Sequence, residues 1–426
     1  MGLKSWIESA NDEKNDFPLQ NLPYGVISGT DRGPRCAVAI GDRVLDLAVL
    51  EKTGLISTGI GRPVFDQPAL NAFMSLGKRA WPKMRARLQD LLAEGGDPAL
   101  RDDAALKKAA LLPLADVSAH LPIKIGDYTD FYASHQHAFN VGSILRGPEN
   151  ALPPNWLHIP IGYNGRASTV VVSGTDIHRP LGQMKPKGAD APLFGPSRRL
   201  DIELEMGAVV GTPNRLGEPV TVAEADEMIF GFVLLNDWSA RDIQAWEYQP
   251  LGPFQAKVFA TSISPWIVSS EALQPFRVPA TERKGPLLPY LADDAPRNYD
   301  IELEILMQPD GAAVATTIAR SNFRYMYYSA AQQLCHHAVG GCLMRTGDLL
   351  GSGTISGPEK QQYGSLLELT WGGKEPLTLE GGETRTFLED GDLMTLRGHA
   401  RGEGYRIGFG ECRGRILPAP QSRPGW

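Results

Sequence analysis

The sequence has little of what marks several protein classes. It has four cysteines in 426 residues and no CxxC pair, which excludes a disulfide-rich scaffold and a cysteine zinc knuckle. No stretch reaches the ~18 apolar residues of a membrane-spanning helix, and the opening MGLKSWIESANDEKNDF lacks the apolar segment of a secretory signal. We therefore expect reduced thiols, no membrane association and a cytoplasmic location.

An excess of one charge is also missing. The 42 Lys and Arg residues are nearly balanced by 49 Asp and Glu residues, giving a formal net charge of −7 with no long run of one sign. This balance argues against nucleic acid or an anionic membrane as a partner, although a local basic pocket is compatible with it. With 42% hydrophobic residues, the chain has the composition of a globular protein with a large core.

What the chain does contain is mostly short strand-like segments separated by glycine and proline. Examples are CAVAI, RASTVVVSG, MIFGFVLLND and YDIELEILM, with 46 glycines and 33 prolines in all. This pattern predicts a mainly β fold (β-rich α+β), with a roll or barrel in its larger part. One long helical stretch, over residues 69–94, is expected to break near Pro82. A proline-containing connection follows it, so we divide the chain into domains 1–120 and 121–426.

The segment DIELEM, residues 201–206, alternates polar and apolar side chains and predicts a strand. Asp201, Glu203 and Glu205 share one face, where like charges this close need either solvent or a cation. A solvated strand face is the simpler interpretation, and a Mg²⁺ or Ca²⁺ site is the functional one. Because the string DIELE recurs at 300–304, the motif alone does not locate a site.

The segment GFVLLNDWSARDIQAWEYQP, residues 231–250, predicts a strand that ends at Asn236–Asp237 and a helix from there to Pro250. On that helix Asp237, Arg241, Gln244 and Tyr248 would form one continuous face. Two interpretations stay open. The face is either an exposed stripe with a weak ion pair of about 0.2–0.5 kcal/mol, or a carboxylate, a guanidinium, an amide and a phenol directed into a pocket.

The segment GDYTDFYASHQHAFNVGSILRG, residues 126–147, predicts a helix capped by Thr129 or Asp130. Asp130 and His137 are seven residues apart, so they would share a helix face. A histidine near a carboxylate is a candidate general base, whereas a lone histidine more often packs or lies on the surface. Tyr132 and Arg146 are further polar groups of this segment.

Several motifs together resemble the fumarylacetoacetase family. They are GDYTDFY, QHAFNVG, LPPNWLHIPIGYNGRAS, LDIELEM, NDWSARDIQAWEY, LGPF before Lys257, SGTISG and GYRIGFG. The similarity runs from about Leu19 nearly to the C-terminus with matching order and spacing. It implies a small N-terminal SH3-like β domain, a large β-rich catalytic domain and a homodimer.

The resemblance also implies roles for particular residues. It places a metal, Mg²⁺ or Ca²⁺, at Asp130, Glu203, Glu205 and Asp237, with Lys257 and Thr261 alongside. It implies His137 as the catalytic base oriented by Glu368, and oxyanion stabilisation by Arg241, Gln244 and Lys257. It assigns substrate binding to Tyr132, Arg146, Tyr163, Gln244, Tyr248 and Thr354. The second DIELE string, residues 300–304, has no role in this pattern.

The implied reaction is hydrolysis of the carbon–carbon bond of 4-fumarylacetoacetate to fumarate and acetoacetate, the last step of tyrosine and phenylalanine breakdown. This sequence departs from the family pattern at Ala256 and Ala260, where glycines are common, and both changes add a methyl group near the site. Two rivals stay open. A hydratase, decarboxylase or acylpyruvate hydrolase of the wider superfamily would share the carboxylates, and a metal-stabilised binding module would have no use for a His137–Glu368 pair.

Overall fold

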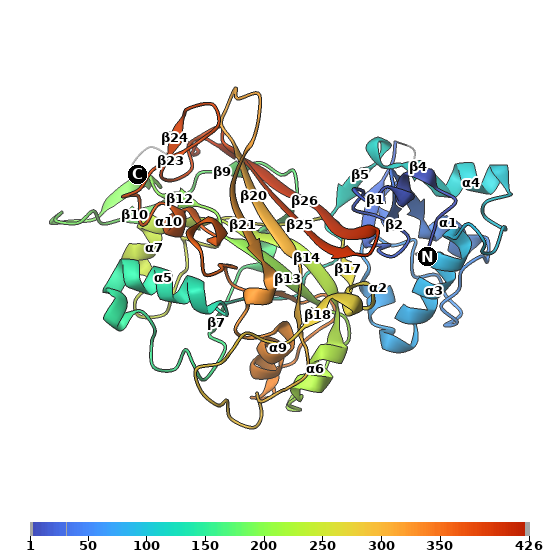
Figure 1. Ribbon diagram of the computed structural model, residues 1–426, viewed down its shortest axis with the longest axis horizontal. Helices are drawn as coiled ribbons and strands as arrows, with labels where there is room; N and C mark the ends of the chain where they lie inside the picture. Colours follow the sequence, from blue (N-terminus) through green and yellow to red (C-terminus); the bar gives the residue numbers. More distant parts are fainter. Residues whose placement is uncertain (1–2, 31, 422–426) are drawn as a thin grey trace.

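The structure is a computed structural model that describes residues 3–30 and 32–421. Two β-rich parts lie side by side, a smaller one built from the beginning of the chain and a larger one built from the rest (Figure 1). The predicted mainly β fold is confirmed. In the described part of the chain no helix combines the length and the apolar character needed to cross a membrane.

The smaller part is an antiparallel sheet in the order β4-β3-β2-β1-β5 with helices beside it. Its strands are β1 (Tyr24–Ser28), β2 (Arg35–Ile40), β3 (Arg43–Asp46), β4 (Leu111–Pro113) and β5 (Ser118–His120). Its helices are α1 (Leu47–Lys52), α2 (Asn71–Met74), α3 (Trp81–Leu92) and α4 (Ala104–Ala110). The expected break near Pro82 is present, between the end of α2 at Met74 and the start of α3 at Trp81. Pro82 lies in the first turn of α3, where its missing N–H costs no hydrogen bond, and the interruption comes before it.

The central sheet of the larger part has the order β7-β6-β22-β13-β14-β16-β8, with β17 also paired to β14. Its strands are β6 (Tyr128–Phe131), β7 (Gly162–Asn164), β8 (Val170–Val172), β13 (Leu204–Val210), β14 (Ile229–Asp237), β16 (Thr261–Ile263), β17 (Val268–Ser269) and β22 (Leu349–Gly351). Every residue of β13 and β14 is buried. Both faces of these strands are therefore covered by other elements, which explains why the strands are apolar apart from Glu205, Asn236 and Asp237.

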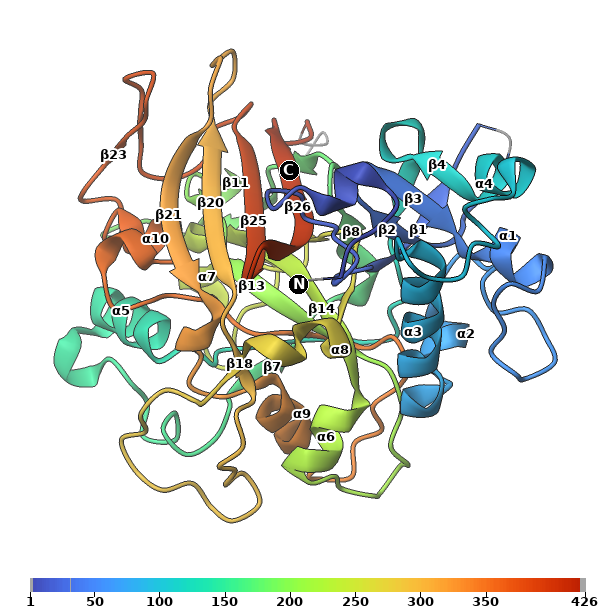
Figure 2. The same cartoon turned by 45° about the vertical axis from the view of Figure 1, so that its right-hand side comes forward.

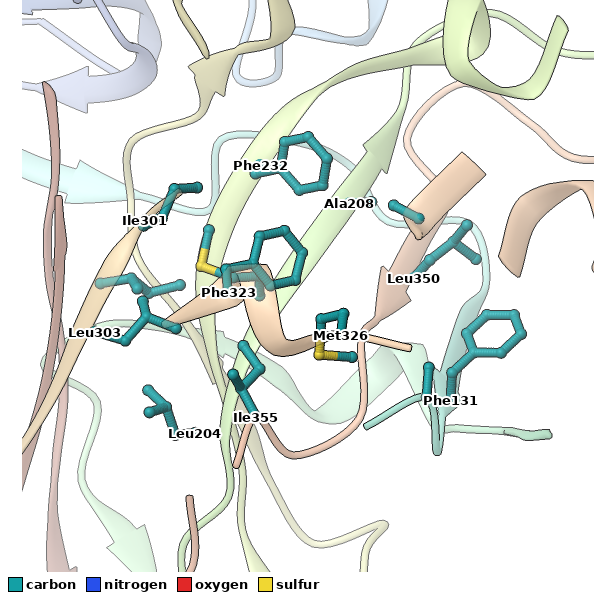
Figure 3. Close-up of a cluster of buried hydrophobic side chains, with 14 of the residues drawn as sticks. Phe131, Leu204, Ala208, Phe232, Ile301, Leu303, Phe323, Met326, Leu350 and Ile355 are labelled. Atoms are coloured by element: carbon teal, nitrogen blue, oxygen red, sulfur yellow. The ribbon is translucent and has the colours of Figure 1, made fainter. Parts of the chain in front are cut away.

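A second sheet, in the order β21-β20-β25-β26-β9, packs over the central one. Its strands are β9 (Ile177–His178), β20 (Glu302–Gln308), β21 (Thr316–Asn322), β25 (Leu393–Gly402) and β26 (Tyr405–Leu417). Figure 3 shows the core between the sheets, where Leu204 of β13 lies near Leu303 of β20 and Phe232 of β14 lies beside Phe323. Phe323 fills this layer, with its ring centroid 5.9 Å from that of Phe232.

Shorter elements surround these sheets. The helices are α5 (His135–Arg146), α6 (Val222–Met228), α7 (Arg241–Glu247), α8 (Ser270–Leu273), α9 (Ala330–Ala338) and α10 (Leu366–Leu369). The two-stranded ribbons pair β10 (Leu181–Met184) with β11 (Leu193–Pro196), β12 (Leu200–Asp201) with β15 (Ser239–Ala240), β18 (Arg277–Val278) with β19 (Asn298–Tyr299), and β23 (Leu377–Thr378) with β24 (Thr384–Arg385).

The two parts share one apolar core. Tyr24, Phe73 and Trp81 of the smaller part pack on Phe230 of β14, with ring centroids 5.0–6.0 Å apart. Figure 2 shows α3 on the side of the smaller part that faces the larger one. The smaller part therefore covers one face of the central sheet and buries apolar surface there.

Candidate active site and metal centre

Buried carboxylates meet at one end of the central sheet. Among the described residues, Asp130, Glu203, Glu205 and Asp237 each offer an oxygen, and these oxygens lie within 4.8 Å of one another. We call these residues the acidic cluster. Asp130 lies on β6, Glu205 on β13, Asp237 at the end of β14 and Glu203 just before β13. All are buried, so the solvated strand face considered for Glu203 and Glu205 is wrong.

A glycine on β22 lets these carboxylates converge. Gly351 pairs with Asp130 on one side and with Gly207 of β13 on the other. A β-carbon added at Gly351 would lie 2.8 Å from Asp130 Oδ1 and 2.9 Å from Glu205 Oε2, too close for real contacts. The backbone N–H of Gly353 donates to Glu205 Oε2 at 3.0 Å and fixes that carboxylate.

The electrostatics of the acidic cluster favour a bound cation. Burial, then the neighbouring carboxylates, raise the pKa of Asp130 and of Glu205 well above the ordinary range. Asp130 Oδ1 and Glu205 Oε1 are buried without a hydrogen-bond partner among the described residues. Unsatisfied buried oxygens of this kind are costly, and an all-oxygen donor set suits a hard divalent ion. The residues present therefore fit the expected Mg²⁺ or Ca²⁺.

Lys257, Tyr163 and Thr261 line the same cluster. The Lys257 ammonium donates to Asp237 Oδ2 at 2.5 Å and also to Glu203. Burial opposes this charge, but the two carboxylates hold the pKa of Lys257 above its ordinary value. A protonated ammonium has no lone pair to offer a metal, so Lys257 supplies charge beside the site. The Tyr163 hydroxyl donates to Asp237 Oδ2 at 3.1 Å, and Thr261 Oγ1 lies 3.5 Å from Asp237 Oδ1.

A histidine–carboxylate pair faces the cluster. His137 Nδ1 lies 2.7 Å from Glu368 Oε2, and His137 Nε2 lies 3.8 Å from Glu203 Oε1. Burial opposes ionisation of Glu368, but His137 and other donors hold its pKa below the ordinary value. An ionised Glu368 accepts a hydrogen bond from Nδ1–H, which leaves the Nε2 lone pair of His137 directed toward the acidic cluster.

Glu368 has further partners that sequence reasoning missed. Its carboxylate accepts hydrogen bonds from Asn140 Nδ2 at 2.9 Å, Ser356 Oγ at 2.9 Å and Ser365 Oγ at 2.8 Å. Only Ser365 had a usable signal, because a serine three residues before a glutamate is the pattern of a helix N-cap. Asn140 and Ser356 come from distant segments, and nothing local marks them.

Three local predictions around these residues were wrong. Neither Thr129 nor Asp130 caps a helix, since both lie in β6; Ser134 caps α5 instead. Asp130 and His137 therefore do not share a helix face, and the turn between β6 and α5 brings them to the same site. The apolar segment LLELTW, residues 366–371, predicts a strand, yet Glu368 lies on the one-turn helix α10.

The helix expected to start at Asp237 starts at Arg241. The ribbon strand β15 (Ser239–Ala240), which pairs with β12, comes directly before the helix. Asp237 therefore belongs to the sheet, and of the predicted helix face only Arg241 and Gln244 lie within the helix. The guanidinium of Arg241 lies 2.7 Å from Glu203 Oε1 and donates to Gln244 Oε1 at 3.1 Å. Tyr248 ends the helix as its C-cap, and its hydroxyl accepts from Gln249.

The other expected substrate-binding residues differ in burial and in their partners. The Tyr132 ring packs edge-on against the His137 ring, with centroids 5.3 Å apart, and Thr354 Oγ1 is buried with no hydrogen-bond partner among the described residues. Arg146 is exposed at the end of α5, where its guanidinium donates to the carbonyls of Asn150 and Ala151. Tyr132 thus lies against His137, whereas the Arg146 guanidinium is turned toward nearby backbone carbonyls.

The second DIELE string has a different environment. Asp300 pairs with Arg324, Glu302 pairs with Arg401, and Glu304 pairs with Arg320, all through partly exposed side chains. These are ordinary surface ion pairs, which contribute little to stability. Identical letters thus give a buried acidic centre in one sheet and a solvated face in the other.

Comparison with known proteins identifies the family. The sequence model described as "Fumarylacetoacetase N-terminal" matches residues 20–122, and the one described as "Fumarylacetoacetate (FAA) hydrolase C-terminal" matches residues 127–417. The chain belongs to the fumarylacetoacetate hydrolase family. The resemblance seen in its motifs is confirmed.

Curated relatives agree over nearly the whole chain. The human fumarylacetoacetase is 54% identical over 410 residues, covering 96% of this chain and 97% of the relative. The Arabidopsis thaliana fumarylacetoacetase is 52% identical over 421 residues, covering 98% and 99%. A solved fumarylacetoacetate hydrolase from Exiguobacterium antarcticum aligns with a TM-score of 0.52 and 16% identity, covering 93% of this chain and 99% of that one. At that identity the structural match supports the shared fold.

Proposed function

We propose that this chain is a fumarylacetoacetase, a hydrolase that cleaves a carbon–carbon bond of 4-fumarylacetoacetate to give fumarate and acetoacetate, the final step of tyrosine and phenylalanine catabolism. The observation that carries this proposal is the His137–Glu368 pair facing a buried acidic cluster, in a chain 54% identical to the human fumarylacetoacetase. A binding module would have no need of the oriented histidine.

The acidic cluster (Asp130, Glu203, Glu205 and Asp237) would hold the divalent ion. Its all-oxygen donors favour Mg²⁺ or Ca²⁺ over zinc. When bound, the ion supplies Lewis acidity that polarises carbonyl oxygens and offsets the charge of an enolate. Lys257 and Thr261 lie alongside, where Lys257 balances part of the carboxylate charge and Thr261 orients Asp237.

His137 is the proposed general base. Glu368 fixes the imidazole with its Nδ1–H bound, so Nε2 can take a proton from water as the oxygen attacks the ketone carbon. Cleavage then leaves acetoacetate as a carbanion equivalent, and the proton held on Nε2 passes to that carbon. Water thus ends with its hydroxyl on fumarate and its hydrogen on acetoacetate, and the enzyme is unchanged.

The cationic and amide groups next to His137 suit the charge that develops. Attack on a ketone produces an oxyanion, which Arg241, Gln244 and Lys257 would stabilise with preorganised donors. We assign substrate binding to Gln244 and to further side chains that carry a hydroxyl or guanidinium group: Tyr132, Arg146, Tyr163, Tyr248 and Thr354. Arg146 suits the remote carboxylate, which a guanidinium binds in bidentate fashion.

We further propose the domain division 1–120 and 121–426, a homodimer and a cytoplasmic location. The division is supported by the ranges 20–122 and 127–417 of the two family models. Residues 1–2 of the first domain and 422–426 of the second lie outside the described residues. The homodimer rests on the family resemblance, and the cytoplasmic location is the expectation stated in the sequence analysis.

The deciding experiment follows loss of the 4-fumarylacetoacetate chromophore with purified protein. We expect turnover with Mg²⁺ or Ca²⁺, its loss in EDTA, and its return when the ion is restored. An acylpyruvate offered in parallel tests the superfamily rival. No loss of 4-fumarylacetoacetate with either ion would reject the proposal.

Two histidines of one helix give a matched pair of variants. His137→Ala should abolish turnover while divalent-ion binding persists, because the acidic cluster is intact. His135→Ala is the control, since His135 packs on Phe139 and Trp156 and has no contact with Glu368 among the described residues. Wild-type activity in His137→Ala would show that the base is assigned wrongly.

A further inference from the structure

One carboxylate of the DIELEM segment takes no part in the acidic cluster. Asp201 lies on β12 and is fully buried, and it is not among the carboxylates that converge on the metal site. A buried carboxylate that holds neither metal nor substrate needs another reason to be there, because burying a charge is costly unless it is fully paired.

Asp201 is fully paired, and its partners come from two separate elements. Its Oδ1 accepts from the backbone N–H of Ile202 at 2.8 Å and of Leu366 at 2.7 Å. Its Oδ2 accepts from the backbone N–H of Leu367 at 3.0 Å and from Arg241 Nε at 2.8 Å. Three backbone donors thus orient the carboxylate, and the fourth donor is a side chain of the active site.

Each element held by Asp201 carries a proposed catalytic group. Leu366 and Leu367 begin α10, and the next residue, Glu368, orients His137. Arg241 begins α7 and, once its Nε is fixed by Asp201, directs its remaining nitrogens to Glu203 and Gln244. The same carboxylate therefore sets where the base and the oxyanion donor stand relative to each other.

We propose that Asp201 is a positioning residue that fixes the His137–Glu368 pair and Arg241 in one frame, so that proton transfer and oxyanion stabilisation act on the same substrate carbon. This inference rests on the proposed function. Its physical basis is that a displacement of about 1 Å in a catalytic group can cost on the order of 100-fold in rate, and an arginine without a fixed Nε partner has many rotamers available.

The second DIELE string provides an internal comparison. Asp300 occupies the position equivalent to Asp201, yet its carboxylate is 44% exposed and bonds to Asn322 and Arg324 on the surface. The strand pattern alone does not demand a buried, four-donor aspartate. What distinguishes Asp201 is that both of the elements it ties together lead into the active site.

The test is Asp201→Asn, which keeps the shape but places an NH₂ group against at least one N–H donor. We expect kcat to fall about 30- to 300-fold, while KM and the affinity for Mg²⁺ or Ca²⁺ each change less than about 3-fold. The matched control is Asp242→Asn. Asp242 accepts from Ser197 Oγ at 2.6 Å and from the Arg198 N–H at 2.7 Å, so it ties the same segment to α7 without holding the guanidinium. Its kcat should stay within about 3-fold of wild type.

A double-mutant cycle separates positioning from general support of the fold. If Asp201 acts through Arg241, the loss in Asp201→Asn/Arg241→Gln is at least 10-fold smaller than the product of the two single losses. Losses that multiply fully would overturn the inference, as would wild-type kcat in Asp201→Asn.

Asp201→Glu decides the question if Asp201→Asn does not fold. It keeps the charge and moves the carboxylate by one methylene, so positioning predicts a kcat loss of about 10-fold or more with KM retained, and an unchanged kcat refutes it. Wild-type protein is assayed beside each variant. If wild type fails on 4-fumarylacetoacetate, the proposed function falls; if wild type turns over and the Asp201 variants match it, only this inference falls.

Discussion

Metal binding to the acidic cluster should release protons and strengthen as pH rises. Burial and mutual repulsion raise the pKa of Asp130 and Glu205 well above the ordinary range in the metal-free protein, so a cation that binds here competes with protons on these carboxyls above the pH range in which carboxyls usually titrate. Glu203 differs: burial opposes its ionisation, but Lys257 and Arg241 hold its pKa below the ordinary value. A divalent ion must therefore displace protons from Asp130 and Glu205, and burial raises the pKa of Asp237 as well.

The magnitude follows from linkage. Each proton displaced makes the affinity rise about 10-fold per pH unit, equivalent to about 1.4 kcal/mol. For Asp130 and Glu205 together the limit is about 100-fold per unit. Stability of the stripped protein has the opposite sign. Because the folded pKa values exceed the unfolded ones, each carboxyl's contribution is complete below the unfolded pKa, near 4, and is lost as pH rises toward the folded pKa, at up to about 1.4 kcal/mol per unit.

The assay is titration calorimetry of Mg²⁺ or Ca²⁺ into EDTA-stripped protein at pH 6, 7 and 8, in two buffers of different ionisation enthalpy so that released protons are counted. Glu205→Gln is the matched variant, because it keeps the shape and removes one titrating group. It should release about one proton fewer and show a shallower pH slope, with weaker binding throughout. An affinity that does not change over these pH values, with no proton release, would refute the reasoning.

Three further predictions use other parts of the structure. Glu368→Gln should lower kcat about 10²- to 10⁴-fold with little change in divalent-ion affinity; steady-state kinetics that match wild type would contradict the proposed orientation of His137. Gly351→Ala should weaken ion binding at least about 10-fold and lower the melting temperature, because the new methyl group meets two carboxylates of the acidic cluster; calorimetry and thermal unfolding decide this. Glu302→Gln/Glu304→Gln should change kcat less than about 2-fold and unfolding free energy by no more than about 1 kcal/mol, and a larger loss of activity would mean that this surface string has a role.

The sequence predicted the site's residue types better than its local structure. The strand character of DIELEM, the apolar strand ending at Asp237 and the mainly β fold follow from period-two alternation and glycine–proline punctuation. Periodicity could not distinguish Glu205 from Glu304, because the two strings are locally identical. The two glutamates differ in burial, because distant segments pack over the strand that carries Glu205 and leave Glu304 partly exposed. Which segments pack over a strand depends on the order of strands in the sheets.

The errors arose where turns interrupt a regular pattern. Asp130 and His137 have helical spacing, yet Tyr128–Phe131 pairs with β22 and β7 before the chain turns into α5. Asp237 likewise has helical spacing to Arg241, but strand pairing extends through it. In both cases long-range ladder hydrogen bonds outweigh local helix propensity. Asp201 is a related case, because the partners that bury and pair its carboxylate come from α10, which lies far along the chain.

The place of β22 in the central sheet has a consequence for biogenesis. This strand lies between β6 and β13, yet it is made long after both, so the sheet has a gap in its middle for much of translation. At about 5–20 residues per second, that interval lasts on the order of ten seconds. Until β22 is synthesised, one edge of β6 and one edge of β13 lack their strand partner and expose unpaired backbone groups. Exposed strand edges of this kind drive aggregation. The nascent enzyme therefore has no assembled ion site to fill, and metal loading should follow completion of the chain.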